Sequence, residues 1–134
     1  MARFLIVDDE PLIALLAQDW LEDLGHQTLG PAHDLQTALK LTQEPMDAAI
    51  LDVSLGADKS FEVARRLRAN AIPFAFATGH APEPFGAEFG DALTLPKPFS
   101  FDAFRSVVDE LAQRAKASDD CLSGRAAAGF AVEK

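Results

Sequence analysis

Five short apolar segments alternate along the chain with segments of helical periodicity, and this alternation constrains the fold more than any other feature. Runs such as RFLIV and MDAAILDV have the continuous apolar character of strands that are buried on both faces. Strands that alternate with helices predict an α/β fold with a parallel sheet and helices on both faces. The predicted strands are residues 3–7, 26–30, 46–53, 73–78 and 92–95.

Helix boundaries are marked by residues of known positional preference. Pro11 suits the first position of a helix, and leucines recur after it at helical spacing. Asp34 and Ser100 are good N-caps for the helices that follow them. Between residues 81 and 90, prolines and glycines oppose a stable helix, so we expect a short or partly melted one. The other predicted helices are residues 11–24, 35–44, 61–69 and 101–116.

Length and charge narrow the class of protein. The chain has 134 residues, which suits one domain, assigned to residues 1–117. Residues 118–134 are small and polar, which predicts a flexible C-terminal tail. A net charge of −9 argues against binding nucleic acid. One cysteine, no signal peptide and no apolar run of about 20 residues predict a cytoplasmic protein without a membrane span.

Polar side chains follow the carboxyl ends of four predicted strands. Asp8 and Asp9 follow the first, Asp52 ends the third, Thr78 ends the fourth and Lys97 follows the fifth. The carboxyl ends of parallel strands meet at one edge of the sheet, where the functional cleft of such folds lies. We therefore expect three carboxylates, a hydroxyl and an ammonium group to share one site.

This combination of groups indicates phosphoryl transfer. Three neighbouring carboxylates repel one another unless a cation lies among them, and their oxygen ligands suit Mg²⁺. A carboxylate beside Mg²⁺ can attack phosphorus and form an acyl phosphate. A metal ion, a lysine and a hydroxyl would offset the charge on the phosphoryl oxygens. Each residue alone also has a structural explanation, but their gathering at four strand ends favours a site.

Four motifs resemble those of the receiver domains of bacterial two-component response regulators. The resemblance covers residues 3 to about 116 and implies a flavodoxin-like (βα)5 receiver fold with strand order 2-1-3-4-5. It also implies that Asp52 is the phosphoacceptor. Asp9 would bind Mg²⁺ directly and Asp8 mainly through water, with Asp52 and the backbone carbonyl of Ser54 as further ligands. The motifs are FLIVDDEP (4–11), AAILDVSL (48–55), FATG (76–79) and LPKPF (95–99).

The resemblance assigns roles to four more side chains. Thr78 would swing toward the phosphoryl group, and Lys97 would pair with it. Before phosphorylation, Lys97 would pair with Asp52 or with the acidic pair. Ser54 and His80 flank the path of the hydrolytic water in such domains and would tune the phosphoryl lifetime. The only chemistry implied is self-catalysed phosphoryl transfer and autodephosphorylation, so the chain is not expected to be an enzyme.

The resemblance also implies which proteins would exchange phosphoryl groups with this chain. The donor would be a phosphohistidine on a sensor histidine kinase or a histidine phosphotransfer protein. Thr94 stands where most receivers carry an aromatic switch residue, and FATGH (76–80) resembles the FAT GUY subgroup of single-domain receivers. That subgroup often works with kinases of the HWE or related type. Because no output domain follows residue 117, we expect output through binding another protein, or a role as phosphate shuttle or sink.

Three alternatives stay open. A phosphatase with an aspartate nucleophile needs a second Asp two residues later, where this chain has Ser54. A flavodoxin-like electron carrier needs a donor-rich phosphate loop, whereas residues 8–10 (DDE) would repel a flavin phosphate. A phosphorylation-independent interaction module would not need the complete set of strand-end residues.

Overall fold

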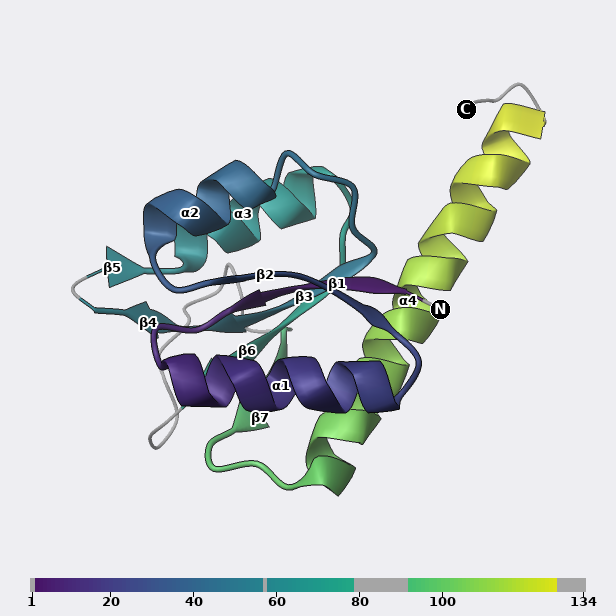
Figure 1. Cartoon of the computed structure of the whole chain (residues 1–134). Helices are drawn as coiled ribbons and strands as arrows, with labels where there is room; N and C mark the ends of the chain where they lie inside the picture. Colours follow the sequence, from purple (N-terminus) through teal and green to yellow (C-terminus); the bar gives the residue numbers. More distant parts are fainter. Residues whose placement is uncertain (1, 57, 79–91, 128–134) are drawn as a thin grey trace.

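The structure is a computed structural model, and it describes residues 2–56, 58–78 and 92–127, with side chains as far as residue 116. A five-stranded sheet of order β2-β1-β3-β6-β7 forms its centre, and every neighbouring pair is parallel (Figure 1). In chain order of these strands this is 2-1-3-4-5, so the predicted sheet is confirmed. The strands are β1 (Arg3–Val7), β2 (Gln27–Ala32), β3 (Ala48–Asp52), β6 (Phe74–Thr78) and β7 (Leu93–Pro96).

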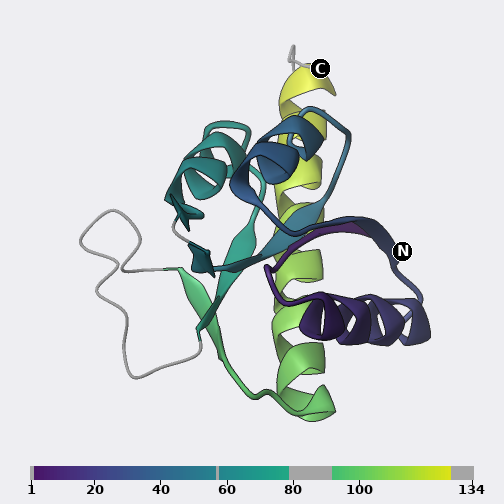
Figure 2. The ribbon, with the colours of Figure 1, turned by 60° about the vertical axis from the view of Figure 1, so that its left-hand side comes forward.

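Helices cover both faces of the sheet, as predicted. Helices α2 and α3 lie on one face and α1 and α4 on the other (Figures 1 and 2). Asp34 caps α2 by accepting the Thr37 N–H at 2.7 Å, and Ser100 accepts the Ala103 N–H at 3.1 Å at the start of α4. Both predicted caps are therefore confirmed. The helices are α1 (Pro11–Asp23), α2 (Leu35–Leu41), α3 (Phe61–Ala69) and α4 (Phe101–Ala127).

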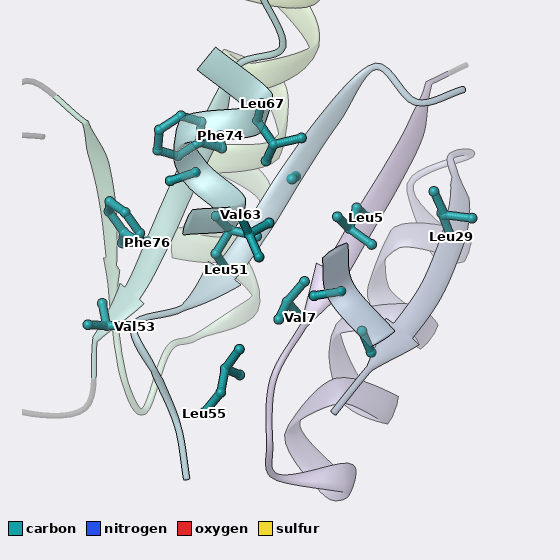
Figure 3. Packing of buried hydrophobic residues seen from close by; sticks show 14 residues of the cluster. Leu5, Val7, Leu29, Leu51, Val53, Leu55, Val63, Leu67, Phe74 and Phe76 are labelled. Atoms are coloured by element: carbon teal, nitrogen blue, oxygen red, sulfur yellow. The ribbon is translucent and has the colours of Figure 1, made fainter. Parts of the chain in front are cut away.

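Two hydrophobic cores result from the alternation of side chains along each strand. In β1, Leu5 and Val7 point to the α2 and α3 face, where they join Leu51, Val63 and Leu67 (Figure 3). The alternate residues of β1 belong to a second core that includes residues of α1 and α4. Both faces of the strands are buried, which explains why their sequences are continuously apolar rather than alternating.

An aromatic cluster joins α1 to the loop before α4. Trp20 of α1 contacts Phe99, Phe101 and Phe104, with ring centroids 5.4–5.9 Å apart and edge-to-face geometry. Phe99 also stacks on Phe104 at 5.6 Å. Such contacts fix the loop that carries Phe99 against α1.

Residues 54–60, predicted as a loop, contain a small antiparallel hairpin. Strand β4 (Ser54–Leu55) pairs with β5 (Asp58–Lys59). Leu55 is buried in the core, which anchors the hairpin, and Gly56 adopts a φ of +66°, a conformation that glycine allows at low cost. Strands of two residues are too short for an apolar pattern to reveal them.

The last helix is longer than predicted. Helix α4 runs to Ala127 instead of ending near Lys116, so its backbone extends through the first part of the segment predicted as a flexible tail. No proline follows Pro98, and alanines in this stretch favour helix, which explains the extension. Residues 128–134 lie outside the described residues. Within the described part of the chain, no helix has the length and apolar character needed to span a membrane.

Candidate functional site

The sheet brings the predicted site residues to one edge. Asp52 at the end of β3 is paired in register with Ala77 of β6, and Thr78 with Pro96 of β7. Asp8, directly after β1, is buried, and so are Asp52 and Thr78. The carboxyl ends of the three parallel strands β1, β3 and β6 therefore hold two carboxylates and a hydroxyl in a region with little access to water.

Lys97 links these carboxylates. Its Nζ lies 2.8 Å from Asp8 Oδ2 and 3.3 Å from Asp52 Oδ2. It is also 3.5 Å from Oε1 of Glu10, but the Glu10 side chain is 64% exposed, whereas that of Lys97 is 11% exposed. Water screens the contact with Glu10, so the two buried pairs hold Lys97 in place. The Lys97 N–H also donates to the Thr78 carbonyl at 2.6 Å, which ties Lys97 to the end of β6.

Burial and the nearby charge of Asp8 raise the pKa of Asp52 to about 7. Burial is the largest cause, and the charge of Asp8 is the second; the ammonium of Lys97 opposes both without cancelling them. Burial lowers the pKa of Lys97, but its hydrogen bond with Asp8 and the charges of Asp8 and Asp52 outweigh this, so the net direction is upward. Two buried carboxylates thus share one cation, and a second cation would relieve their repulsion.

The hairpin β4–β5 lies against the same edge. The Gly56 N–H donates to Asp9 Oδ2 at 3.1 Å, and the Ser54 N–H donates to Asp52 Oδ1 at 3.4 Å. Lys59 Nζ donates to the Ser54 hydroxyl at 2.9 Å. Backbone donors of the hairpin therefore contact Asp9 and Asp52, and the Lys59 ammonium contacts Ser54 beside them.

The oxygen ligands fit a hard divalent cation. Carboxylate oxygens of Asp8, Asp9 and Glu10 lie within 4.8 Å of one another. Asp52 is outside that group and joins it through Lys97. Mg²⁺ is typically held by one or two carboxylates and keeps several waters, so a set of acidic oxygens that is partly open to solvent suits it. Asp8, Asp9 and Asp52 are the side chains that could hold the ion.

Several contacts in the site involve residues that the sequence patterns did not single out. Two hydrogen bonds hold the backbone of Asp8. Its N–H donates to the Ala32 carbonyl at 2.9 Å, and its carbonyl lies 3.0 Å from His33 Nδ1. A carbonyl only accepts, so His33 Nδ1 is the donor. Glu10 could have been found from the DDE run, but the His33, Gly56 and Lys59 contacts depend on the path of the chain. His80 lies outside the described residues.

Comparisons with known proteins give one consistent result. The family model for the response regulator receiver domain matches residues 4–109. The phyllosphere-induced regulator PhyR of Methylorubrum extorquens is 35% identical over 110 residues, which cover 72% of this chain and 38% of PhyR. The curated transcriptional regulatory protein YxdJ of Bacillus subtilis is 28% identical, and 52% of its length is covered. The chain thus spans about half or less of the length of these curated relatives.

Among solved structures, the solution structure of SdrG from Sphingomonas melonis is 41% identical. The match covers 83% of this chain and 96% of the SdrG chain, and its TM-score is 0.74. A BeF3-activated conformation of SdrG is similar with a TM-score of 0.70, covering 82% of this chain and 95% of that one.

Proposed function

We propose, from the premise that this chain belongs to the response regulator receiver domain family of two-component signalling, that it is a switch phosphorylated on Asp52. The observation that carries the proposal is the buried Asp52 carboxylate at the end of β3, with Lys97 Nζ 3.3 Å away and Asp8 beside it. The proposal includes Mg²⁺ at Asp8, Asp9 and Asp52 with the backbone carbonyl of Ser54.

Each group has a part in the proposed reaction. An Asp52 carboxylate oxygen attacks the phosphorus, a P–O bond forms, and the bond from phosphorus to the donor breaks. Bound Mg²⁺ would supply positive charge to the phosphoryl oxygens. Lys97, released from Asp52, moves its ammonium to a phosphoryl oxygen, and the Thr78 hydroxyl donates to another. Asp52 must be ionised to attack, and its burial and the charge of Asp8, which raise its pKa to about 7, oppose ionisation until a second cation offsets them.

Mass spectrometry tests this function directly. Incubation with acetyl phosphate and Mg²⁺ should add about 80 Da, the mass of a phosphoryl group, to the wild type. The Asp52→Asn variant should show no adduct, because an amide is a poor nucleophile, and EDTA should prevent the reaction in the wild type. The control Asp102→Asn, on an exposed side chain of α4, should react like the wild type. An unmodified wild type would favour the phosphorylation-independent interaction module.

The phosphoryl donor that we propose is a sensor histidine kinase or a histidine phosphotransfer protein, the partner class of receiver domains. Helix α1 offers a docking surface beside the site. Leu12 and Leu15 are 80% and 52% exposed, and no other large apolar side chain among the described residues is as exposed as these. They stand two and five residues after Glu10, which contacts Lys97. Apolar side chains left in water at this place fit contact with a protein.

Replacing both leucines should slow phosphorylation by a protein donor and leave phosphorylation by a small-molecule donor unchanged. In Leu12→Ser/Leu15→Ser we expect transfer from a phosphorylated kinase to slow about tenfold, the effect of losing about 1.4 kcal/mol of contact. Phosphorylation by acetyl phosphate should stay unchanged, because the site itself is intact. The kinase used in this test is chosen from a panel of sensor histidine kinases as the one that transfers fastest to the wild type. The matched control is Asp19→Ser, an exposed position further along α1; equal slowing with acetyl phosphate would contradict the assignment.

Three finer points belong to the same proposal. The FATGH motif supports a kinase of the HWE or related type. Catalysis is limited to the chain's own phosphorylation and dephosphorylation, tuned by Ser54 and His80. A single cysteine, Cys121, which can form no disulfide within the chain, supports the reducing cytoplasm as its compartment. A pull-down with and without beryllofluoride would distinguish a switch from a phosphate shuttle or sink.

A further inference from the structure

The hairpin β4–β5 carries one functional group that the proposed reaction does not use, the ammonium of Lys59. The hairpin is fixed where β4 enters the turn: Leu55 is buried in the core, and the Gly56 N–H donates to Asp9 Oδ2 at 3.1 Å. Lys59 is paired in register with Ser54, the residue two positions after Asp52. The backbone thus holds the start of the Lys59 side chain beside the site.

Lys59 contacts the same residue, Ser54, that contacts the proposed phosphoacceptor. Its Nζ donates to the Ser54 hydroxyl at 2.9 Å, and the Ser54 N–H donates to Asp52 Oδ1 at 3.4 Å. A single residue therefore separates the ammonium from the carboxylate that would receive the phosphoryl group. The contact is with a neutral hydroxyl and is exposed, so leaving it for a phosphate oxygen costs little, since Lys has a flexible four-carbon stem.

The negative charge at this edge would repel an anionic phosphoryl donor, and the Lys59 ammonium would offset it. Lys97 is held between two buried carboxylates, Asp8 and Asp52, and cannot meet an incoming donor until one of these contacts breaks. Asp9 and Glu10 add two exposed negative charges, and the whole chain carries −9. A dianionic phosphoryl donor is repelled by such a surface within a Debye length of about 8–10 Å. An exposed cation at the entrance offsets that repulsion.

We propose that Lys59 is a second phosphate-binding cation, which captures dianionic phosphoryl donors and contacts a phosphoryl oxygen during transfer to Asp52. This inference rests on the proposed function. With acetyl phosphate, a bond forms between the Asp52 carboxylate oxygen and phosphorus, the P–O bond to the acetyl group breaks, and acetate leaves with the electron pair. Lys59 stays protonated throughout, and Ser54 holds its ammonium near the site when no donor is present.

The test compares rates of phosphorylation by acetyl phosphate at saturating Mg²⁺, followed by intact-mass spectrometry. We expect Lys59→Gln to lower the second-order rate about fivefold and Lys59→Arg to keep it within about twofold, because Arg keeps the charge. The rate for the wild type should fall as salt is raised, and the fall should be smaller for Lys59→Gln. The matched control is Lys40→Gln, an exposed lysine in the last turn of α2 that makes the same change in net charge.

Each outcome bears on the inference. Equal rates and salt dependence for Lys59→Gln and the wild type overturn it, while the proposed function stands because Asp52 is still phosphorylated. Equal slowing in Lys59→Gln and Lys40→Gln also overturns it, because net charge would then be the cause. A wild type that takes up no phosphoryl group overturns the proposed function first, and this inference with it. Thermal unfolding of each variant shows whether a lowered rate reflects a misfolded fraction.

Discussion

Lys97→Met should destabilise the metal-free protein by roughly 3–5 kcal/mol, the cost of leaving buried charges without their partner. Lys97 Nζ is 2.8 Å from Asp8 Oδ2 and 3.3 Å from Asp52 Oδ2, and all three side chains are nearly buried. Met has a similar volume and fills the same space, so the loss is mainly electrostatic. Both carboxylates would then face each other with no cation between them, and protonation of one would recover only part of the loss.

Urea unfolding in EDTA at pH 8 measures this effect. The double variant Lys97→Met/Asp52→Asn should recover part of the lost stability, because it removes one of the two unpaired carboxylates. This double variant also keeps the prediction testable if Lys97→Met alone does not fold. Lys116→Met, on an exposed lysine of α4, is the control and should change stability by less than about 0.5 kcal/mol. A loss below about 1 kcal/mol for Lys97→Met would contradict the buried pairing.

Asp52→Asn should stabilise the metal-free protein, although it removes the proposed phosphoacceptor. Folding raises the pKa of Asp52 from 3.8 to about 7, chiefly through burial and the charge of Asp8. Ionising Asp52 in the folded state therefore costs free energy. That cost is absent below about pH 4, grows as the pH rises from 4 to 7 and is complete above 7. An amide carries no charge at any of these values and avoids the cost.

The expected gain at pH 8 in EDTA is roughly 2–4 kcal/mol, since three pKa units correspond to about 4 kcal/mol at most. At pH 4 the gain should nearly vanish. Chemical unfolding at several pH values gives the curve, and Asp102→Asn, at an exposed aspartate, provides a control with no such trend. Mg²⁺ should reverse the order of stability, because the wild type binds the ion more tightly. A gain that is independent of pH would show that charge at Asp52 is not the cause.

Much of the fold followed from the apolar pattern because both faces of the sheet are buried. Strand β1 (Arg3–Val7) and helix α3 (Phe61–Ala69) have the predicted bounds. The strand-end rule also placed Asp8, Asp52 and Lys97 at one edge, because register in a parallel sheet decides which ends meet. These features depend on periodicity and topology, which a single sequence carries.

The features that were not predicted depend on the path of the chain. The hairpin β4–β5 has strands of two residues, and its contact between Gly56 and Asp9 joins positions that are 47 residues apart. Likewise, His33 reaches the Asp8 carbonyl only because β2 lies beside β1. Helix α4 continues beyond its predicted end near Lys116, where alanines favour helix and no proline interrupts it. No periodic pattern marks a hydrogen bond between a loop and a distant strand end.

The position of Trp20 suggests a use for its intrinsic fluorescence as a report on the site. It is the only tryptophan of the chain, and its ring centroid lies 5.9 Å from that of Phe99, two residues beyond Lys97. A backbone shift at Lys97 that accompanies contact with a new ligand would displace Phe99, two residues further along the chain. The surroundings of the indole would then change, and so would its emission. We therefore expect occupancy of the acidic edge to be followed, without a label, by the intrinsic fluorescence of the unmodified protein.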